Sequence, residues 1–190
     1  MNTHKKIYTM MLSALLVAVG TVIPMFMPKV VIPPMSFTIA SHVAVMLGIF
    51  ISPTVATFVA LGTTLGFFVS GTPFIVVLRA LSHVIWAFGG GLYIQKHPET
   101  FASPIKSLSF NFVMSFIHAL AEVIVVTPFY IGTMSTETFI MTVFVLVGVG
   151  SLIHSMVDFT ISLMVWKVLS KNSSIADISN VKKIYIIKNA

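Results

Sequence analysis

Ionisable side chains stand inside apolar segments of this sequence, where a membrane would make them costly. The segment FIVVLRALSHVIWAFGGGLY (74–93) carries Arg79, the only arginine of the chain, with His83 one helical turn later. The planar guanidinium group of arginine pairs with a carboxylate through two parallel hydrogen bonds. An arginine within hydrocarbon therefore predicts an anionic partner, which is a carboxylate of either the protein or a ligand.

Three apolar segments carry polar residues at helical spacing, so that each polar set falls on one face of its helix. The sets are Arg79, Ser82, His83 and Trp86; Asn111, Ser115, His118 and Glu122; and Ser151, His154, Ser155, Asp158 and Ser162. Since ionisable residues in membrane helices usually face the bundle interior, three such helices are expected to surround one polar space.

The depths of these residues suggest a pocket that opens on the outer side. Counted from the expected helix ends at about 1.5 Å per residue, Arg79 and Glu122 lie roughly 7–8 Å deep, and His42 lies at a similar level. The other ionisable residues are expected deeper: His83 and His118 by one turn, and His154 and Asp158 in the inner half. A cation, an anion and a histidine therefore share the outer level.

Several roles remain open for these groups. Arg79 either forms an ion pair with Glu122 that locks two helices together or binds a ligand carboxylate, and Glu122 can hold Arg79 while the pocket is empty. His154 and Asp158, one turn apart, suit an internal hydrogen-bond pair.

We expect no metal site, because the sequence lacks cysteine and an HExxH motif. No nucleophile motif such as G-x-S-x-G predicts an enzyme.

Aromatic residues near the outer side could stack on a flat ligand. They are Phe37, Phe67, Phe68, Phe74, Trp86, Phe129 and Tyr130. Because the chain has 16 phenylalanines, most of them must face lipid or the protein core. The substrate-binding candidates are therefore Arg79, His83, Glu122, His118, His42, Trp86 and Phe74.

The composition predicts an all-α integral membrane protein. Of the 190 residues 57% are hydrophobic and 8% are charged, whereas soluble domains carry about 25% charged residues. The basic residues sit at the ends of apolar runs and form no stripe with interleaved aromatics, which argues against nucleic-acid binding. Without a P-loop motif the chain is not expected to bind ATP that way.

Apolar runs of about 20 residues predict six transmembrane helices in one bundle. The expected helices are 7–27, 37–51, 54–70, 74–94, 106–127 and 137–167, and the breaks between them carry proline and glycine. The first run is too long for a signal peptide. The second and third are short, and are read as either tilted spans or one broken hairpin. Residues 1–170 form the substrate-binding domain and residues 171–190 a short basic tail.

The lysines predict that both termini are cytoplasmic. With six spans, nine lysines fall on the side of the termini and only Lys29 falls on the other side. Cytoplasmic loops of membrane proteins carry the excess of lysine and arginine. The basic tail is expected to lie near anionic lipid.

The whole pattern resembles the substrate-binding S component of an energy-coupling factor (ECF) vitamin transporter. The similarity rests on the chain length, the six spans, Ala14 and Ala18 in the first helix, and the proline-rich loop KVVIPPMSF that precedes a pair of helices rich in small residues, with Gly62 and Gly66 in the second of them. The stretch FFVSGTPFIVVLRALSHVIWAF looks most like the niacin-specific members.

The resemblance implies a site walled by helices 4 to 6 and covered by residues 28–38 and 69–74. It implies that Ala14 and Ala18 face a membrane-embedded coupling subunit, that two ATPase subunits supply energy, and that the protein lies in a prokaryotic plasma membrane. Arg79 would hold the carboxylate of nicotinate, and His83 or His118 its ring nitrogen. Pantothenate and biotin also carry a carboxylate and stay open as substrates.

Two other classes of function remain open. An autonomous carrier or channel would use His118, Glu122, His154 and Asp158 as a proton relay. A membrane scaffold without a ligand would use Arg79 only for a structural ion pair. Transport by the chain alone and binding of a small molecule separate these classes from an S component.

Overall fold

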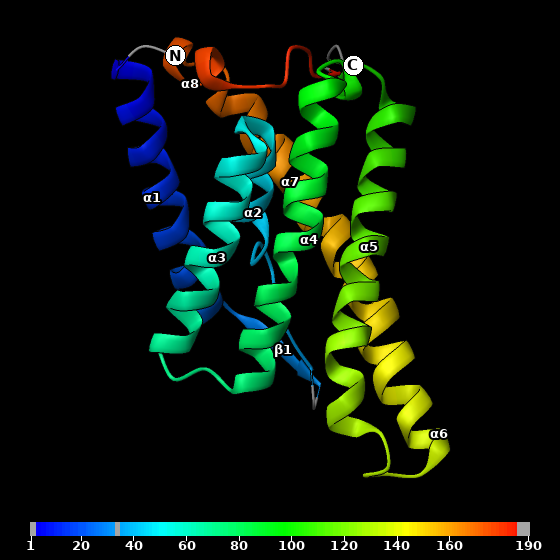
Figure 1. The fold of residues 1–190 in the computed structure, drawn as a ribbon. Coiled ribbons are helices and arrows are strands. Elements are labelled where there is room, and N and C mark those ends of the chain that lie inside the picture. Colours follow the sequence, from blue (N-terminus) through cyan, green and yellow to red (C-terminus); the bar gives the residue numbers. More distant parts are fainter. Residues whose placement is uncertain (1–2, 33–34, 186–190) are drawn as a thin grey trace.

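Helices dominate the fold, because a backbone in hydrocarbon must satisfy its own hydrogen bonds. The computed structural model describes residues 3–32 and 35–185. In chain order its elements are α1 (Thr3–Phe26), β1 (Lys29–Ile32), β2 (Met35–Thr38), α2 (Val43–Ile51), α3 (Pro53–Val69), α4 (Phe74–Lys96), η1 (Thr100–Ala102), α5 (Pro104–Tyr130), α6 (Thr136–Phe139), η2 (Ile140–Val149), α7 (Gly150–Leu169) and α8 (Ser173–Ile178) (Figure 1).

Within the described residues, four helical stretches are long and apolar enough to cross a membrane. They are α1, α4, α5 and the continuous run Thr136–Leu169 of α6, η2 and α7. The expectation of an all-α membrane protein is thereby confirmed. Helices α2 and α3 are each shorter than the about 20 residues of a full span. They form a helical hairpin around Ser52, which is one of the two alternatives that the sequence left open.

The expected helix over 37–51 is wrong in its first part. Residues Lys29–Ile32 and Met35–Thr38 pair as a short antiparallel hairpin, and α2 begins only at Val43. The carboxylate of Asp158 accepts hydrogen bonds from the backbone N–H groups of Ala40, at 2.8 Å, and His42, at 3.0 Å. These bonds satisfy donors at the start of α2 from another helix, so the helix does not need to extend into the preceding strand.

Small residues bring α1 and α3 close together. A Cβ atom added to Gly62 would lie 2.5 Å from the Val17 side chain, and one added to Gly66 would lie 2.4 Å from that of Thr21. Such close approach is typical of helix pairs in membranes. The face of α1 that carries Ala14 and Ala18 is exposed instead, so these two alanines do not serve packing within the chain.

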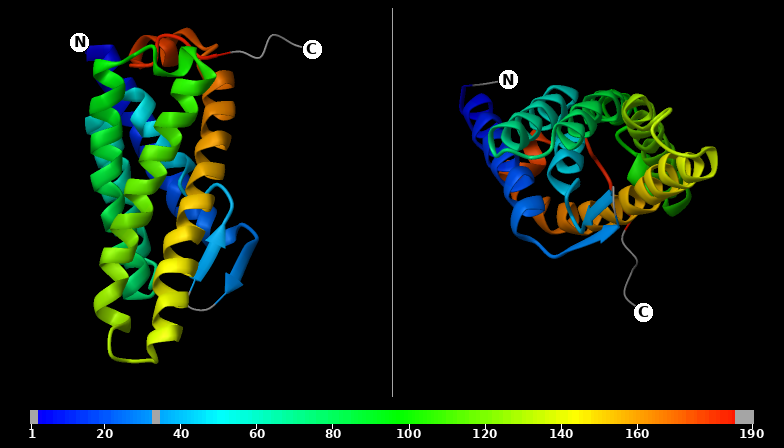
Figure 2. Two further views of the ribbon diagram at one scale, coloured as in Figure 1. Left: turned by 90° about the vertical axis from the view of Figure 1, so that its right-hand side faces the viewer. Right: turned by 90° about the horizontal axis from the view of Figure 1, so that it is seen from below.

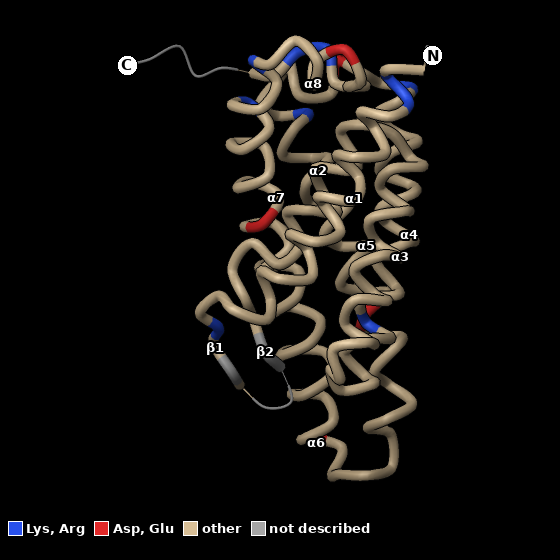
Figure 3. Tube along the Cα trace, turned by 90° about the vertical axis from the view of Figure 1, so that its left-hand side faces the viewer, with Lys and Arg blue, Asp and Glu red and all other residues tan. Residues whose placement is uncertain are grey.

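Lysines gather at one end of the bundle, where α1 begins and α8 lies (Figures 1 and 3). Lys5 at the start of α1 pairs with Asp177 of α8 at 3.3 Å. The Asn180 N–H donates to the Phe50 carbonyl, and Ile175 is buried. The described part of the tail therefore packs across this end, and Lys188 lies outside the described residues.

The middle part of the last long helix, η2, has i→i+5 hydrogen bonds of the π type. A π-helix advances less per residue than an α-helix, so residues after it lie nearer to its start than an α-helical count suggests. The expected level of His42, beside Arg79 and Glu122, is wrong, because His42 Nδ1 lies 2.9 Å from Oδ2 of Asp158, a residue expected in the inner half. Helix α2 begins only at Val43, so His42 lies deeper than a helix over 37–51 would place it.

Candidate functional site

A cavity of about 540 Å³ lies in the half of the bundle away from the lysine-rich end. It is lined by Gly20, Pro24 and Met25 of α1, Lys29, Phe37 and Thr38 of the hairpin, Ser41, His42, Val45, Thr63 and Phe67, Ser70–Pro73 before α4, Val76, Arg79, Ala80 and His83, Glu122, Ser151 and His154. The volume falls within the about 300–1,000 Å³ of small-molecule sites. Viewed along the bundle axis, the hairpin lies across one side of the helices (Figure 2).

The walls differ in part from those that the family resemblance implied. The predicted covering segments, 28–38 and 69–74, do contribute Lys29, Phe37 and the turn before α4. The walls, however, are not confined to helices 4 to 6, because α1, α2 and α3 contribute as well. The close packing of α1 on α3 is the reason, since it brings the end of α1 to the cavity.

Glu122 of α5 is the centre of one polar group. Its Oε2 lies 2.9 Å from Arg79 Nη2 and accepts a short hydrogen bond from the Ser151 hydroxyl. Its Oε1 faces His118 Nε2 at 3.3 Å and His83 Nε2 at 3.7 Å. The predicted pairing of Arg79 with Glu122 is therefore present, and one carboxylate joins α4, α5 and α7.

Asp158 of α7 is the centre of a second group. Besides the two backbone donors at the start of α2, its Oδ2 lies 2.9 Å from His42 Nδ1 and 3.4 Å from His154 Nε2. The Ser41 hydroxyl lies 3.0 Å from His154 Nε2 and 3.4 Å from Asp158. The internal His154–Asp158 contact expected from the sequence is present, and α2 joins it.

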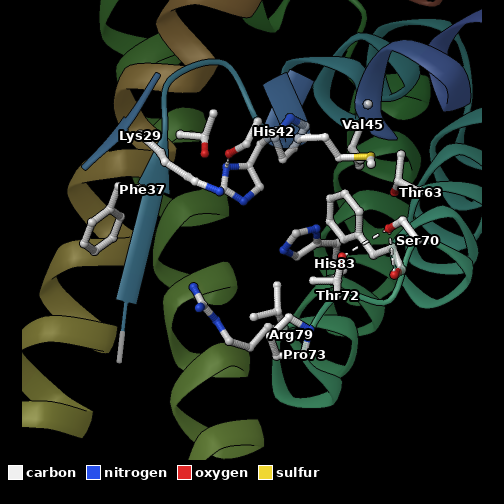
Figure 4. Close-up of a pocket in the computed structure, with 18 of the residues that line it drawn as sticks. Lys29, Phe37, His42, Val45, Thr63, Ser70, Thr72, Pro73, Arg79 and His83 are labelled. Atoms are coloured by element: carbon white, nitrogen blue, oxygen red, sulfur yellow. Dashed lines mark hydrogen bonds between the residues drawn. The ribbon is translucent and has the colours of Figure 1, made fainter. Parts of the chain in front are cut away.

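His42 connects the two groups. Its ring centroid lies 5.1 Å from that of His154, 4.9 Å from that of His83 and 4.7 Å from that of His118. Trp86 lies beneath, with its ring centroid 5.6 Å from His83. Figure 4 shows His42, Arg79 and His83 around one space, although they come from different parts of the chain.

The predicted site residues fall into three classes. Arg79, His83, Glu122 and His42 line the cavity. His118 and Trp86 are buried behind it. Phe74 lies outside the cavity lining and is 59% exposed at the start of α4, so the structure does not bring it to the site.

The aromatic candidates separate in the same way. Phe37 and Phe67 line the cavity, whereas Phe68 and Phe129 are exposed. Sequence spacing could not distinguish them, because an aromatic ring in a membrane helix suits lipid as well as a pocket.

Sequence reasoning missed two polar groups of the site. Lys29 lines the cavity from β1, and its isolation from the other lysines was a signal that served only to assign orientation. Ser151 bonds to Glu122, although it stood in the polar set of its helix. The pairing of Ser151 with Glu122 depends on the packing of α5 on α7, which the sequence does not show.

Comparison with known proteins places the chain in a family. It is 41% identical over 169 residues to the niacin transporter NiaX of Lactococcus lactis subsp. cremoris (strain MG1363), a match that covers 87% of this chain and 76% of that protein. The chain belongs to the NiaX transporter family. No protein-family model matches the sequence, and no solved structure does.

Membership of the NiaX family confirms the resemblance to an S component most like the niacin-specific members. It also supports the expectation that the protein is a multi-pass protein of the cell membrane with a role in transport. The NiaX relative is a transporter, which accords with the lack of any nucleophile motif in this chain.

Proposed function

We propose that this protein is the substrate-capture subunit of an ATP-driven ECF importer and that it binds nicotinate in the cavity around Arg79. The observation that carries the proposal is an arginine that lines a cavity, with its side chain only 13% exposed, in a chain 41% identical to the niacin transporter NiaX. The cavity, the charge of Arg79 and the flat aromatic surfaces each match one part of nicotinate.

Arg79 supplies the carboxylate site. A guanidinium group carries five N–H donors, and Glu122 accepts one of the two at Nη2. The buried Nε has no hydrogen-bond partner among the described residues. Donors are therefore left for a carboxylate, which a guanidinium binds in a two-point geometry. Glu122 keeps the cation paired while the cavity is empty.

The ring of nicotinate would lie among the aromatic and histidine side chains. Phe37 and Phe67 offer flat apolar surface, and offset stacking is the preferred contact between such rings. His83 lines the cavity, and its buried Nε2 has no hydrogen-bond partner within the described residues. We assign His83, with His118 behind it, to the polar contacts of the pyridine ring.

Charge supports an outward-facing cavity. The lysines of α1, α4, α5, α7 and the tail gather at the end opposite the cavity (Figure 3). The positive-inside rule assigns that end, with both termini, to the cytoplasm. The cavity then faces outside, and the hairpin and Ser70–Pro73 would cover it.

Transport would need partner subunits. The sequence has no P-loop, so two ATPase subunits and a membrane-embedded coupling subunit would supply the energy, as the family resemblance implies. Ala14 and Ala18 lie on an exposed face of α1, which would leave them free to contact the coupling subunit.

Calorimetric titration of the purified chain in detergent tests the proposal. We expect saturable nicotinate binding, much weaker binding of the uncharged nicotinamide, and loss of nicotinate binding in Arg79→Gln. Lys96→Gln is the matched control, because Lys96 is an exposed cation at the far end of α4. Unchanged binding in folded Arg79→Gln would remove the carboxylate assignment. Binding of pantothenate or biotin in place of nicotinate would correct the substrate.

A further inference from the structure

Three imidazole rings meet at the cavity, and two of them, His42 and His83, line it. The ring centroids of His42, His83 and His118 lie 4.9, 4.7 and 4.9 Å apart, at the corners of a nearly equilateral triangle. The rings come from the start of α2, from α4 and from α5, and they are steeply tilted to one another. Side chains so far apart in sequence meet here only through the packing of three helices.

Three ring nitrogens of this triangle lack partners. His83 Nε2 and both nitrogens of His118 are buried, and none of them has a hydrogen bond within residues 3–32 and 35–185. His118 Nε2 lies 3.3 Å from Glu122 Oε1 without meeting hydrogen-bond geometry. Buried polar atoms are nearly always paired, so these nitrogens indicate a missing partner.

The spacing of the rings matches that around a metal ion. With metal–nitrogen distances of about 2.0–2.1 Å, three imidazoles on a tetrahedral ion have ring centroids about 5 Å apart. Edge-to-face packing of rings gives similar spacing, but it leaves the nitrogens unpaired. One nitrogen of each histidine and one oxygen of Glu122 all lie within 4.8 Å of one another.

We propose that His42, His83, His118 and Glu122 bind a divalent transition-metal ion of the zinc type. The chain has no cysteine, so the ligands are imidazole and carboxylate, which suit zinc, cobalt and nickel. Glu122 would use Oε1, because Oε2 is held by Arg79 and Ser151. The sequence predicted no metal here because the four ligands share no local motif.

Asp158 prepares His42 for this role. An ionised carboxylate only accepts hydrogen bonds, so the 2.9 Å contact places the proton of His42 on Nδ1. Nε2 of a neutral His42 is then free to bind the metal. A carboxylate behind a metal-bound histidine is the usual arrangement around such ions.

The charges around this site favour an anionic ligand beside the ion. Glu122 and Asp158 carry two negative charges, which offset the positive charges of Arg79 and Lys29 around the cavity. A divalent ion would leave this region positive, and an anion from the cavity would then offset part of that charge. Since His42, His83 and Glu122 line the cavity, the open coordination position faces it. When the ion is bound, the ring nitrogen of a heteroaromatic acid would occupy that position in place of a direct contact with His83, and its carboxylate would stay on Arg79.

Cobalt titration without nicotinate tests the metal site. The protein is purified without a histidine tag, stripped with EDTA and titrated with Co²⁺, whose visible absorption reports its coordination. We expect one Co²⁺ per chain, strong visible bands typical of four or five ligands, and displacement by Zn²⁺. Wild-type protein that takes up no stoichiometric Co²⁺ would overturn the proposal.

Variants separate this site from surface histidines. His118→Gln and His83→Gln should each lose the visible bands, whereas Asp158→Asn should weaken Co²⁺ binding about 10–100-fold. His4→Gln and His97→Gln are controls, because both histidines are exposed. Gel filtration shows which variants fold, and unchanged bands in either folded ligand variant would refute the site. Because the cobalt titration contains no nicotinate, the absence of a metal site would not disprove nicotinate binding. Likewise, a failure to bind nicotinate would not disprove the metal site.

Discussion

Asp158 of α7 accepts a hydrogen bond from the backbone N–H of His42, 3.0 Å away, and so caps α2 from 116 residues further along the chain. The same carboxylate accepts the N–H of Ala40, whose φ of 67° is in the left-handed region. Asp158 is fully buried. One side chain therefore sets the start of α2, the turn before it and the position of the His42 ring.

Removing this carboxylate should destabilise the protein. In Asp158→Ala the backbone donors of Ala40 and His42 lose their partner, and each buried unpaired group costs about 1–3 kcal/mol. We expect a clearly lower Tm, measured by tryptophan fluorescence, because Trp86 and Trp166 are both buried. Asp177→Ala is the control, since its exposed pair with Lys5 should contribute less than about 1 kcal/mol. Equal Tm changes in the two variants would contradict the capping role.

Glu122→Gln should make the protein depend on its ligand. Breaking a buried ion pair costs about 3–5 kcal/mol, because Arg79 keeps its charge without a partner. A bound carboxylate restores that partner. In EDTA-treated protein, nicotinate should therefore raise the Tm of this variant more than that of the wild type.

Glu137→Gln, at an exposed position of α6, should respond to nicotinate as the wild type does. A smaller nicotinate effect in Glu122→Gln than in the wild type would mean that the ligand carboxylate does not pair with Arg79.

The contact between α1 and α3 should be sensitive to one methyl group. In Gly62→Ala the new Cβ meets the stiff Val17 side chain at 2.5 Å, and overpacking of this kind costs about 1–3 kcal/mol. Gly89→Ala on α4 has no atom within 4 Å of the new Cβ and should be neutral or stabilising by up to about 1 kcal/mol. Thermal unfolding of both variants tests this expectation. An unchanged Tm of Gly62→Ala would show that the helices can separate without cost.

Ala14→Trp should separate binding from uptake. Ala14 is exposed and distant from the cavity lining, so calorimetry should give wild-type nicotinate affinity. A bulky ring on this face should prevent docking of a coupling subunit and abolish uptake in cells. Ile124→Trp, at an exposed position of α5, is the control for a large ring facing lipid. Full uptake with Ala14→Trp would exclude this face as the docking surface.

The chain alone should not transport. Liposomes that contain only this protein are expected to bind nicotinate without accumulating it, with or without a proton gradient. Accumulation driven by a proton gradient, and lost in Glu122→Gln, would favour the autonomous carrier with a histidine and carboxylate relay.

The membrane class and the polar helix faces could be read from the sequence, because hydropathy and helical period depend only on residues near one another in the chain. The buried Asn111, Ser115, His118 and Glu122 are an example of such a face. Arg79 stood out for the same reason, as a charge that hydrocarbon does not tolerate alone.

The partners of these residues were decided by the tertiary structure. His42 comes to Asp158 because a hairpin replaces the first turns of the expected helix and α2 begins only at Val43. The bonds that hold this start join Ala40 and His42 to Asp158, more than 100 residues away, and no local pattern contains such contacts. Hence the sequence could identify the ionisable groups, whereas only the packed helices could bring His42, His83 and His118 into one triangle around Glu122.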